Sequence, residues 1–128
     1  MTIRIVRLGS PRHPQEGLRV GTVRRPPRGV SKADWARRDF FDVWLPLLAP
    51  SEALVKAALA ARDAREWKSF ARRFQAEMKR PDASRTLDLL GALSSTTNLS
   101  VGCYCEDESR CHRSILRELL SQRGARIE

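Results

Sequence analysis

The chain has 128 residues, a length that suits one domain with its own hydrophobic core. Apolar residues make up 41% of it, with only seven glycines and seven prolines, which argues against a disordered or low-complexity chain. The formal net charge is +9, and neither the opening "MTIRIVRLGS" nor any later stretch is apolar enough for a signal peptide or a membrane span. We therefore expect a cytoplasmic protein with no membrane partner, whose cysteines are thiols or metal ligands rather than disulfides.

The positive charge is concentrated near the N-terminus. Residues 1–38 carry ten lysines and arginines against two acidic residues, whereas residues 39–128 carry fourteen against thirteen. This asymmetry indicates an anionic partner, either a small phosphate-bearing molecule or nucleic acid. A basic surface that serves only solubility is the alternative, because charge alone specifies no partner.

Two strands are predicted at the start of the chain. In "TIRIVRL", Ile3 and Ile5 alternate with arginines, and "LRVGTVRR" repeats the alternation less regularly. The glycines and prolines of residues 9–17 predict a loop between them. A stiff loop, "PPRGVSK", follows the second strand, because proline cannot donate a hydrogen bond to a sheet.

Helical patterns occupy the middle of the chain. Ser31 is expected to cap a helix over residues 32–45, which Pro46 ends, and Ser51 to cap another in "APSEALVKAALAARD". The third pattern is the clearest, with bulky or apolar side chains at i, i+3, i+4, i+7 and i+11: Trp67, Phe70, Ala71, Phe74 and Met78. These positions predict a buried helix face.

The last third predicts a helix, a strand and a helix. "PDASRTLDLLGALSS" is expected to bury Leu87, Leu90 and Leu93, "NLSVGCYC" to form a strand, and "CHRSILRELLSQRG" to form a helix that Gly124 ends. Strands at both ends with helices between them predict an α/β fold: one domain over residues 1–128, with a small, mostly parallel sheet flanked by helices.

The segment "CYCEDESRCH" holds all three cysteines and one of the two histidines. It follows a predicted strand and opens a predicted helix, and α/β proteins tend to bind ligands at such strand ends. The first N–H groups of a helix lack intrahelical partners and favour anions. We therefore expect a small anionic ligand here, held by side chains of the helix start and of the proline-rich loop. The candidate anion-binding residues are Arg25, Arg28, Arg110, Arg113 and Ser114.

A thiol role overlaps with this anion site. At a helix start between two arginines, the pKa of Cys111 is expected to be lowered, which makes Cys111 a candidate nucleophile. His112 is a candidate general acid or base. Adjacent helical residues do not face each other, so a direct Cys111–His112 pair is not expected. The Cys-x5-Arg loop of cysteine phosphatases is absent, because Ser109 and Cys111 stand six residues after Cys103 and Cys105.

Two alternatives stay open for the cysteine segment. A zinc site would use Cys103, Cys105, Cys111 and His112, although their spacing matches no common zinc finger. In the other alternative the cysteines are small buried residues that only fill space. The preferred interpretation needs no metal and no cofactor.

Several segments together resemble a known family. "RVGTVRRPPRGVSKADW", "DVWLPLLAPSEAL" and "EWKSFARRFQAEM" are similar to the YeaO-like branch of the bacterial DUF488 family, and "VGCYCEDESRCHRSIL" resembles the Cys-His-Arg signature of the wider family. Relatives in that branch have a Leu-Trp pair before "PRG", where Arg25 and Pro26 stand here. The resemblance implies a small cytosolic α/β protein in which Arg28, His112 and Arg113 serve a shared site, and it implies no particular activity.

Overall fold

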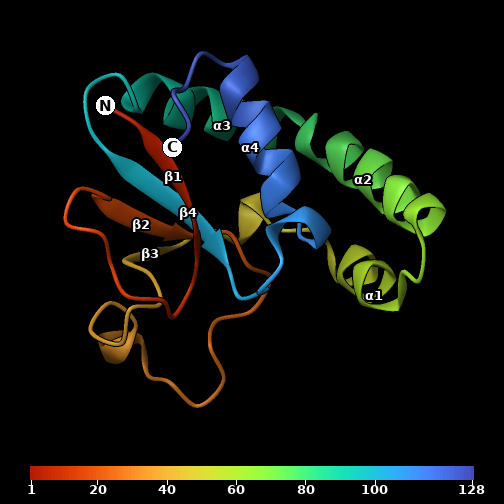
Figure 1. The fold of residues 1–128 in the computed structure, drawn as a ribbon, viewed down its shortest axis with the longest axis horizontal. Helices are drawn as coiled ribbons and strands as arrows, with labels where there is room; N and C mark the ends of the chain where they lie inside the picture. The colour runs from red at the N-terminus through yellow and green to blue at the C-terminus, as the bar shows by residue number, and fades with distance from the viewer.

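The computed structural model describes all 128 residues (Figure 1). In chain order the strands and α-helices are β1 (Ile3–Arg7), β2 (Leu18–Gly21), β3 (Val43–Trp44), α1 (Glu52–Ala60), α2 (Ala64–Met78), α3 (Pro81–Leu93), β4 (Leu99–Cys103) and α4 (Arg113–Gln122). Short 3₁₀ helices cover Lys32–Asp34, Pro46–Leu48 and Glu108–Arg110. None of the helices combines the length and the apolar character that a bilayer crossing requires.

The four strands form one sheet in the order β1-β4-β2-β3, and every neighbouring pair is parallel. This confirms the predicted α/β fold with a parallel sheet. Strand β4 is central and all of its residues are buried, which agrees with its apolar sequence. At one edge β3 has only two residues, and at the other Ile127 forms a bridge to Ile3 beside β1.

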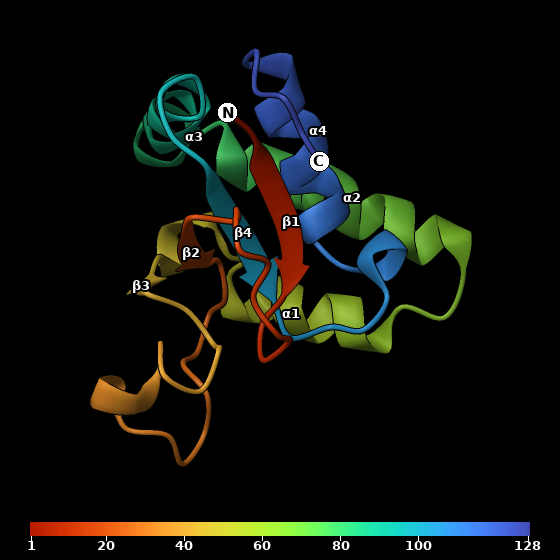
Figure 2. The same cartoon turned by 60° about the vertical axis from the view of Figure 1, so that its left-hand side comes forward.

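Glycine is required at the middle of the sheet. A Cβ atom on Gly102 would lie 2.8 Å from the carbonyl oxygen of Val6 and 2.7 Å from a methyl group of Leu8. The absence of a side chain therefore lets β1 and the residue after it pack closely against β4. The carboxyl ends of these parallel strands point toward α1 and the start of α4 (Figures 1 and 2).

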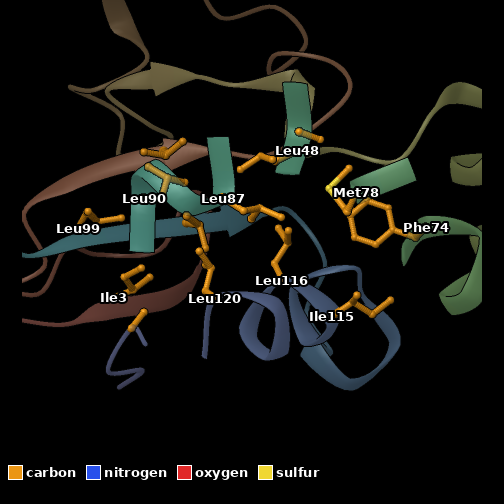
Figure 3. Packing of buried hydrophobic residues seen from close by; sticks show 14 of the residues in the cluster. Ile3, Leu48, Phe74, Met78, Leu87, Leu90, Leu99, Ile115, Leu116 and Leu120 are labelled. Carbon is orange, nitrogen blue, oxygen red and sulfur yellow. The ribbon is translucent and has the colours of Figure 1, made fainter. Parts of the chain in front are cut away.

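The helices pack against the sheet around one main apolar core (Figure 3). The periodic face of α2 is confirmed, since Phe70, Phe74 and Met78 are buried. In α3, Leu87 and Leu90 are buried as predicted, but Leu93 is 40% exposed, so that part of the prediction is wrong. Leu93 lies in the last turn of α3, where the helix face has already rotated away from the core.

The predicted helix over residues 32–45 is wrong. Only Lys32–Asp34 form a 3₁₀ turn, Ser31 makes no side-chain cap, and Asp39 has a φ of 62°. A helix cannot continue through this left-handed conformation. Residues 35–44 instead turn back onto the sheet and bury Phe41, because the aromatic side chains of this segment pack around a second, smaller apolar cluster.

A buried ion pair fixes the loops beside β2. The guanidinium of Arg19, which is 0% exposed, donates to both carboxylate oxygens of Glu16 at 2.5 and 2.9 Å. The same guanidinium donates to the carbonyl oxygens of Ser10 and Asp39. Glu16 also accepts a hydrogen bond from the hydroxyl of Ser100 in β4. This network ties two loops to the sheet, and no pattern in the sequence predicted it.

Candidate functional site

The cysteine segment connects the carboxyl end of β4 to the start of α4. Cys103 is the last residue of β4. Helix α4 begins at Arg113 rather than at Cys111, where the predicted helical segment starts, because Cys111 has extended backbone angles. The loop between them is held in place by Glu108, whose carboxylate accepts two hydrogen bonds from Arg117 of α4 at 2.6 and 2.9 Å. The sequence therefore folds this segment into a fixed turn over the end of the sheet.

The three thiols of this segment form a cluster, which we call the thiol cluster (Cys103, Cys105 and Cys111). The Sγ atoms of Cys103 and Cys105 are 3.7 Å apart, and the Cys103 thiol donates to Cys105. That hydrogen bond, the neighbouring Cys111 thiol and the positive charge of Arg113 hold the pKa of Cys105 well below its ordinary value. Donating its proton to Cys105 raises the pKa of Cys103. The pKa of Cys111 is lowered as well, as the sequence predicted, chiefly by its hydrogen bond with Cys103. Cys105 differs from Cys111 in being exposed to solvent.

Cys111 and His112 do face each other, so the expectation that they would not is wrong. Cys111 Sγ lies 3.7 Å from His112 Nδ1. Because both residues precede the first residue of α4, the geometry of adjacent helical residues does not apply to them. His112 Nε2 lies 2.6 Å from the carbonyl oxygen of Thr22, directly after β2. A carbonyl only accepts, so Nε2 carries the proton and Nδ1 presents its lone pair to Cys111.

Arg113 is a buried cation without an acidic partner. Arg113 is only 3% exposed. Its Nη2 donates to the carbonyl oxygen of Cys105 at 2.6 Å, and its Nε has no hydrogen-bond partner. Burying a charge is costly unless an opposite charge compensates it. The charge of Arg113 lowers the pKa of Cys105, and a thiolate at Cys105 would compensate that charge.

An apolar pocket of about 240 Å³ opens beside the thiol cluster. Its walls come mainly from the segment after β2 and from α1 and α2: Val23, Pro50, Val55, Ala58, Leu59 and Phe70. Cys103, Cys105 and His112 also line it, together with Tyr104 and with Arg25. Cys111 does not line the pocket, and it is only 2% exposed. Of the three thiols, only Cys105 is exposed.

The predicted anion-binding residues do not all gather at one point. Arg25 lines the pocket and forms an exposed ion pair with Glu52, whereas Arg28 and Arg110 are exposed. The hydroxyl of Ser114 donates to the carbonyl oxygen of Cys111, at 2.9 Å. Arg113 lies beneath the helix start, in contact with Cys105, as described above. Arg25 is therefore the member of this group that a ligand in the pocket would meet.

A metal ion is compatible with part of the cluster. The ligating atoms of Cys103, Cys111 and His112 all lie within 4.8 Å of one another. Two thiolates and an imidazole form a known ligand set for zinc, which would leave a fourth position for another group. The zinc alternative considered from the sequence thus has a geometric basis in these three residues.

Residues 3–124 match the family model described as the active DUF488-N3 subclade. No curated protein and no solved structure shows a significant match to the chain. The family match covers every strand and helix described above, including the complete cysteine segment. The YeaO-like branch stays a prediction.

Proposed function

Starting from the fact that this chain belongs to the DUF488 family, in a subclade described as active, we propose that it is a thiol-dependent enzyme with Cys105 as its nucleophile. One observation carries this proposal: Cys105 is the exposed thiol of the cluster, and it lies in the wall of an apolar pocket. A thiolate, rather than a thiol, is the attacking species in such enzymes. Buried Arg113 and the thiol donors favour that ionised form.

Cys111 and His112 keep catalytic roles in this proposal, but as a proton-transfer pair. His112 lines the pocket, and its Nδ1 faces the thiol of Cys111. When the thiolate of Cys105 forms a bond to an electrophilic atom, the leaving group departs with the bonding electrons and needs a proton. Because His112 lines the same pocket as Cys105, the Cys111–His112 pair can supply that proton and take one from water in the return step.

The lining of the pocket suggests the substrate class. Apolar walls favour an apolar or aromatic group, and a volume of about 240 Å³ limits the substrate to a small molecule. The guanidinium of Arg25 at the pocket pairs with the carboxylate of Glu52, and both side chains are exposed. Because exposed ion pairs are weak, an anionic group of a ligand can displace Glu52. We therefore propose a small anionic electrophile with an apolar body.

The test is alkylation of Cys105 as a function of pH. Iodoacetamide is expected to label Cys105 at a rate that changes less than about 3-fold between pH 5 and 8, whereas an ordinary thiol gains about 10-fold per pH unit over this range. Mass spectrometry locates the label. Cys105→Ser is expected to abolish labelling of the folded protein, because the two other thiols are buried. Labelling that rises 10-fold per unit would contradict the proposal.

Two further measurements on the same protein test whether it turns over an ester and whether its pocket prefers an anionic reagent. p-Nitrophenyl acetate is expected to release one equivalent of nitrophenolate per chain in a burst, with the acetyl group on Cys105. Arg25→Ala should slow alkylation by iodoacetate, an anion, and leave alkylation by neutral iodoacetamide unchanged. If Cys105 is alkylated but p-nitrophenyl acetate gives no burst, the enzyme proposal is refuted. If the protein contains stoichiometric zinc that blocks labelling until it is chelated, the metal alternative is favoured.

A second candidate function, nucleic-acid binding, has one observation in its favour. The loop of residues 24–38, which we call the basic loop, contains six lysines and arginines and one acidic residue. It extends away from the helices (Figures 1 and 2). Arg28 and Lys32 are exposed and take part in no ion pair of the chain, unlike Arg25 and Arg37. Such a loop suits a phosphodiester backbone.

Charge reversal separates this candidate from a merely basic surface. Arg28→Glu combined with Lys32→Glu is expected to weaken binding of a fluorescent single-stranded 20-mer at least about 10-fold at low salt, measured by anisotropy. The matched control, Lys68→Glu with Arg72→Glu, makes the same charge change at exposed positions of α2. An equal loss in both variants would mean that total charge, and not the basic loop, attracts the polymer.

A further inference from the structure

We infer that Cys105 is a site of oxidation by peroxides and that Cys103 is the resolving thiol that closes a disulfide with it. The inference goes beyond the proposed function: it shares the sulfur of Cys105 but needs neither the pocket ligand nor turnover. It stands on the arrangement of the three thiols, of which Cys105 is exposed and the other two are buried, with Cys103 in contact with Cys105.

Access selects the sulfur that reacts first. Cys105 is exposed, whereas Cys103 is 6% and Cys111 2% exposed. A small peroxide in solvent therefore meets the sulfur of Cys105 before the others. Cys105 also lines the pocket beside the thiol cluster, and the Cys103 thiol donates to its sulfur at 3.7 Å, so the sulfur that a peroxide meets first has a second thiol next to it.

Distance selects the resolving thiol. Cys103 Sγ lies 3.7 Å from Cys105 Sγ, and a disulfide requires about 2.05 Å, so a small side-chain rotation closes the gap. Cys105 lies two residues beyond the end of β4, outside the hydrogen-bonded ladder, so its backbone can follow the movement. Cys111 Sγ instead faces the imidazole of His112 and accepts from the backbone N–H of Arg113 at 3.5 Å.

The chemistry balances with a hydroperoxide as oxidant. The Cys105 thiolate attacks one peroxide oxygen: an S–O bond forms, the O–O bond breaks, and the departing alkoxide or hydroxide takes a proton. The thiol of Cys103 then attacks the oxidised sulfur, the S–O bond breaks, and the hydroxide that leaves takes the Cys103 proton as water. Two electrons pass from the two sulfurs to the peroxide, and a dithiol reductant returns them by exchange.

Peptide mapping tests this assignment. Trypsin places Cys103 and Cys105 together in the peptide 86–110 and Cys111 in the separate peptide 111–113. The protein is treated with one equivalent of hydrogen peroxide and its remaining thiols are then blocked. We expect peptide 86–110 to carry no blocking group and to be two hydrogens lighter than its reduced form. Peptide 111–113 is expected to carry one blocking group. A cross-link between the two peptides, or sulfinic acid at Cys105 in place of a disulfide, would overturn the assignment.

Variants supply the controls. Cys111→Ser is expected to form the same disulfide, whereas Cys103→Ser is expected to stop at a sulfenic acid that dimedone traps. Circular dichroism checks the fold of each variant, and the wild-type map decides alone if either fails to fold. The two proposals fail separately: alkylation with flat pH dependence but no disulfide refutes only the oxidation site, and a disulfide without a nitrophenolate burst refutes only the enzyme.

Discussion

Glu16→Gln is expected to lower the free energy of unfolding by about 3–5 kcal/mol, because it leaves the guanidinium of Arg19 buried without a negative partner. Glutamine keeps the size of the side chain, so the loss reports the charge rather than a cavity. The measurement is urea unfolding at pH 7. Glu52→Gln is the matched control, since Glu52 pairs with Arg25 at the surface, and it is expected to change stability by less than about 1 kcal/mol.

The same carboxylate predicts acid sensitivity. Burial alone would raise the pKa of Glu16, but the hydrogen bonds from Arg19, the His13 backbone and Ser100 outweigh it and lower the pKa from 4.5 to about 2. A carboxyl group with a depressed pKa stabilises the fold above its unfolded pKa and loses that contribution as pH falls through the folded value. The wild type should therefore lose about 3 kcal/mol between pH 4.5 and 2, and Glu16→Gln should lack this step. Equal acid dependence in both proteins would contradict the assignment.

Arg113→Met is expected to shift the midpoint of the alkylation profile of Cys105 upward by about one to two pH units. The substitution removes the buried positive charge, so the Cys105 thiolate loses part of what stabilises it. Methionine is of similar length and apolar, and replacing a buried charge by such a side chain is often tolerated. The profile is measured with iodoacetamide pulses over the pH range in which circular dichroism shows a folded protein.

Two comparisons make the Arg113 result specific. Arg110→Met removes an exposed arginine three residues earlier and is expected to leave the midpoint unchanged. Arg113→Lys keeps a positive charge and should shift the midpoint less than methionine does. If all three variants give the wild-type profile, the thiol hydrogen bonds alone account for the ionisation of Cys105, and Arg113 has no part in it.

The sequence predicted the fold well where a pattern extends over several turns. The row from Trp67 to Met78 repeats often enough for its buried face to be unambiguous, and Ser51 caps α1 with an oxygen that accepts from Leu54. The helix predicted after Ser31 was wrong, because the aromatic residues of this segment fit a helix face and a folded-back loop equally well. The left-handed conformation of Asp39, which decides between them, has no strong sequence signal.

The structure brings together the thiols of the predicted segment, but their arrangement was not predicted from the sequence. Proximity of cysteines, histidine and arginine in the sequence identified the segment. The exposed thiol, however, is Cys105, which the predicted strand "NLSVGCYC" had included. The end of β4 at Cys103 sets that exposure, and a difference of two residues is within the usual uncertainty of an element boundary. The pairing of His112 with Thr22 joins residues 90 positions apart, which no local pattern encodes.

The two edges of the sheet bear on how the protein behaves at high concentration. Amyloid-like or domain-swapped assembly needs a long strand with free backbone donors and acceptors that another molecule can extend. Here the Val43–Trp44 edge offers only two residues, and at the β1 edge the bridge from Ile127 covers Ile3. Strand addition at the Val43–Trp44 edge should accordingly be weak, and at the other edge the C-terminal residues compete with an incoming strand for Ile3.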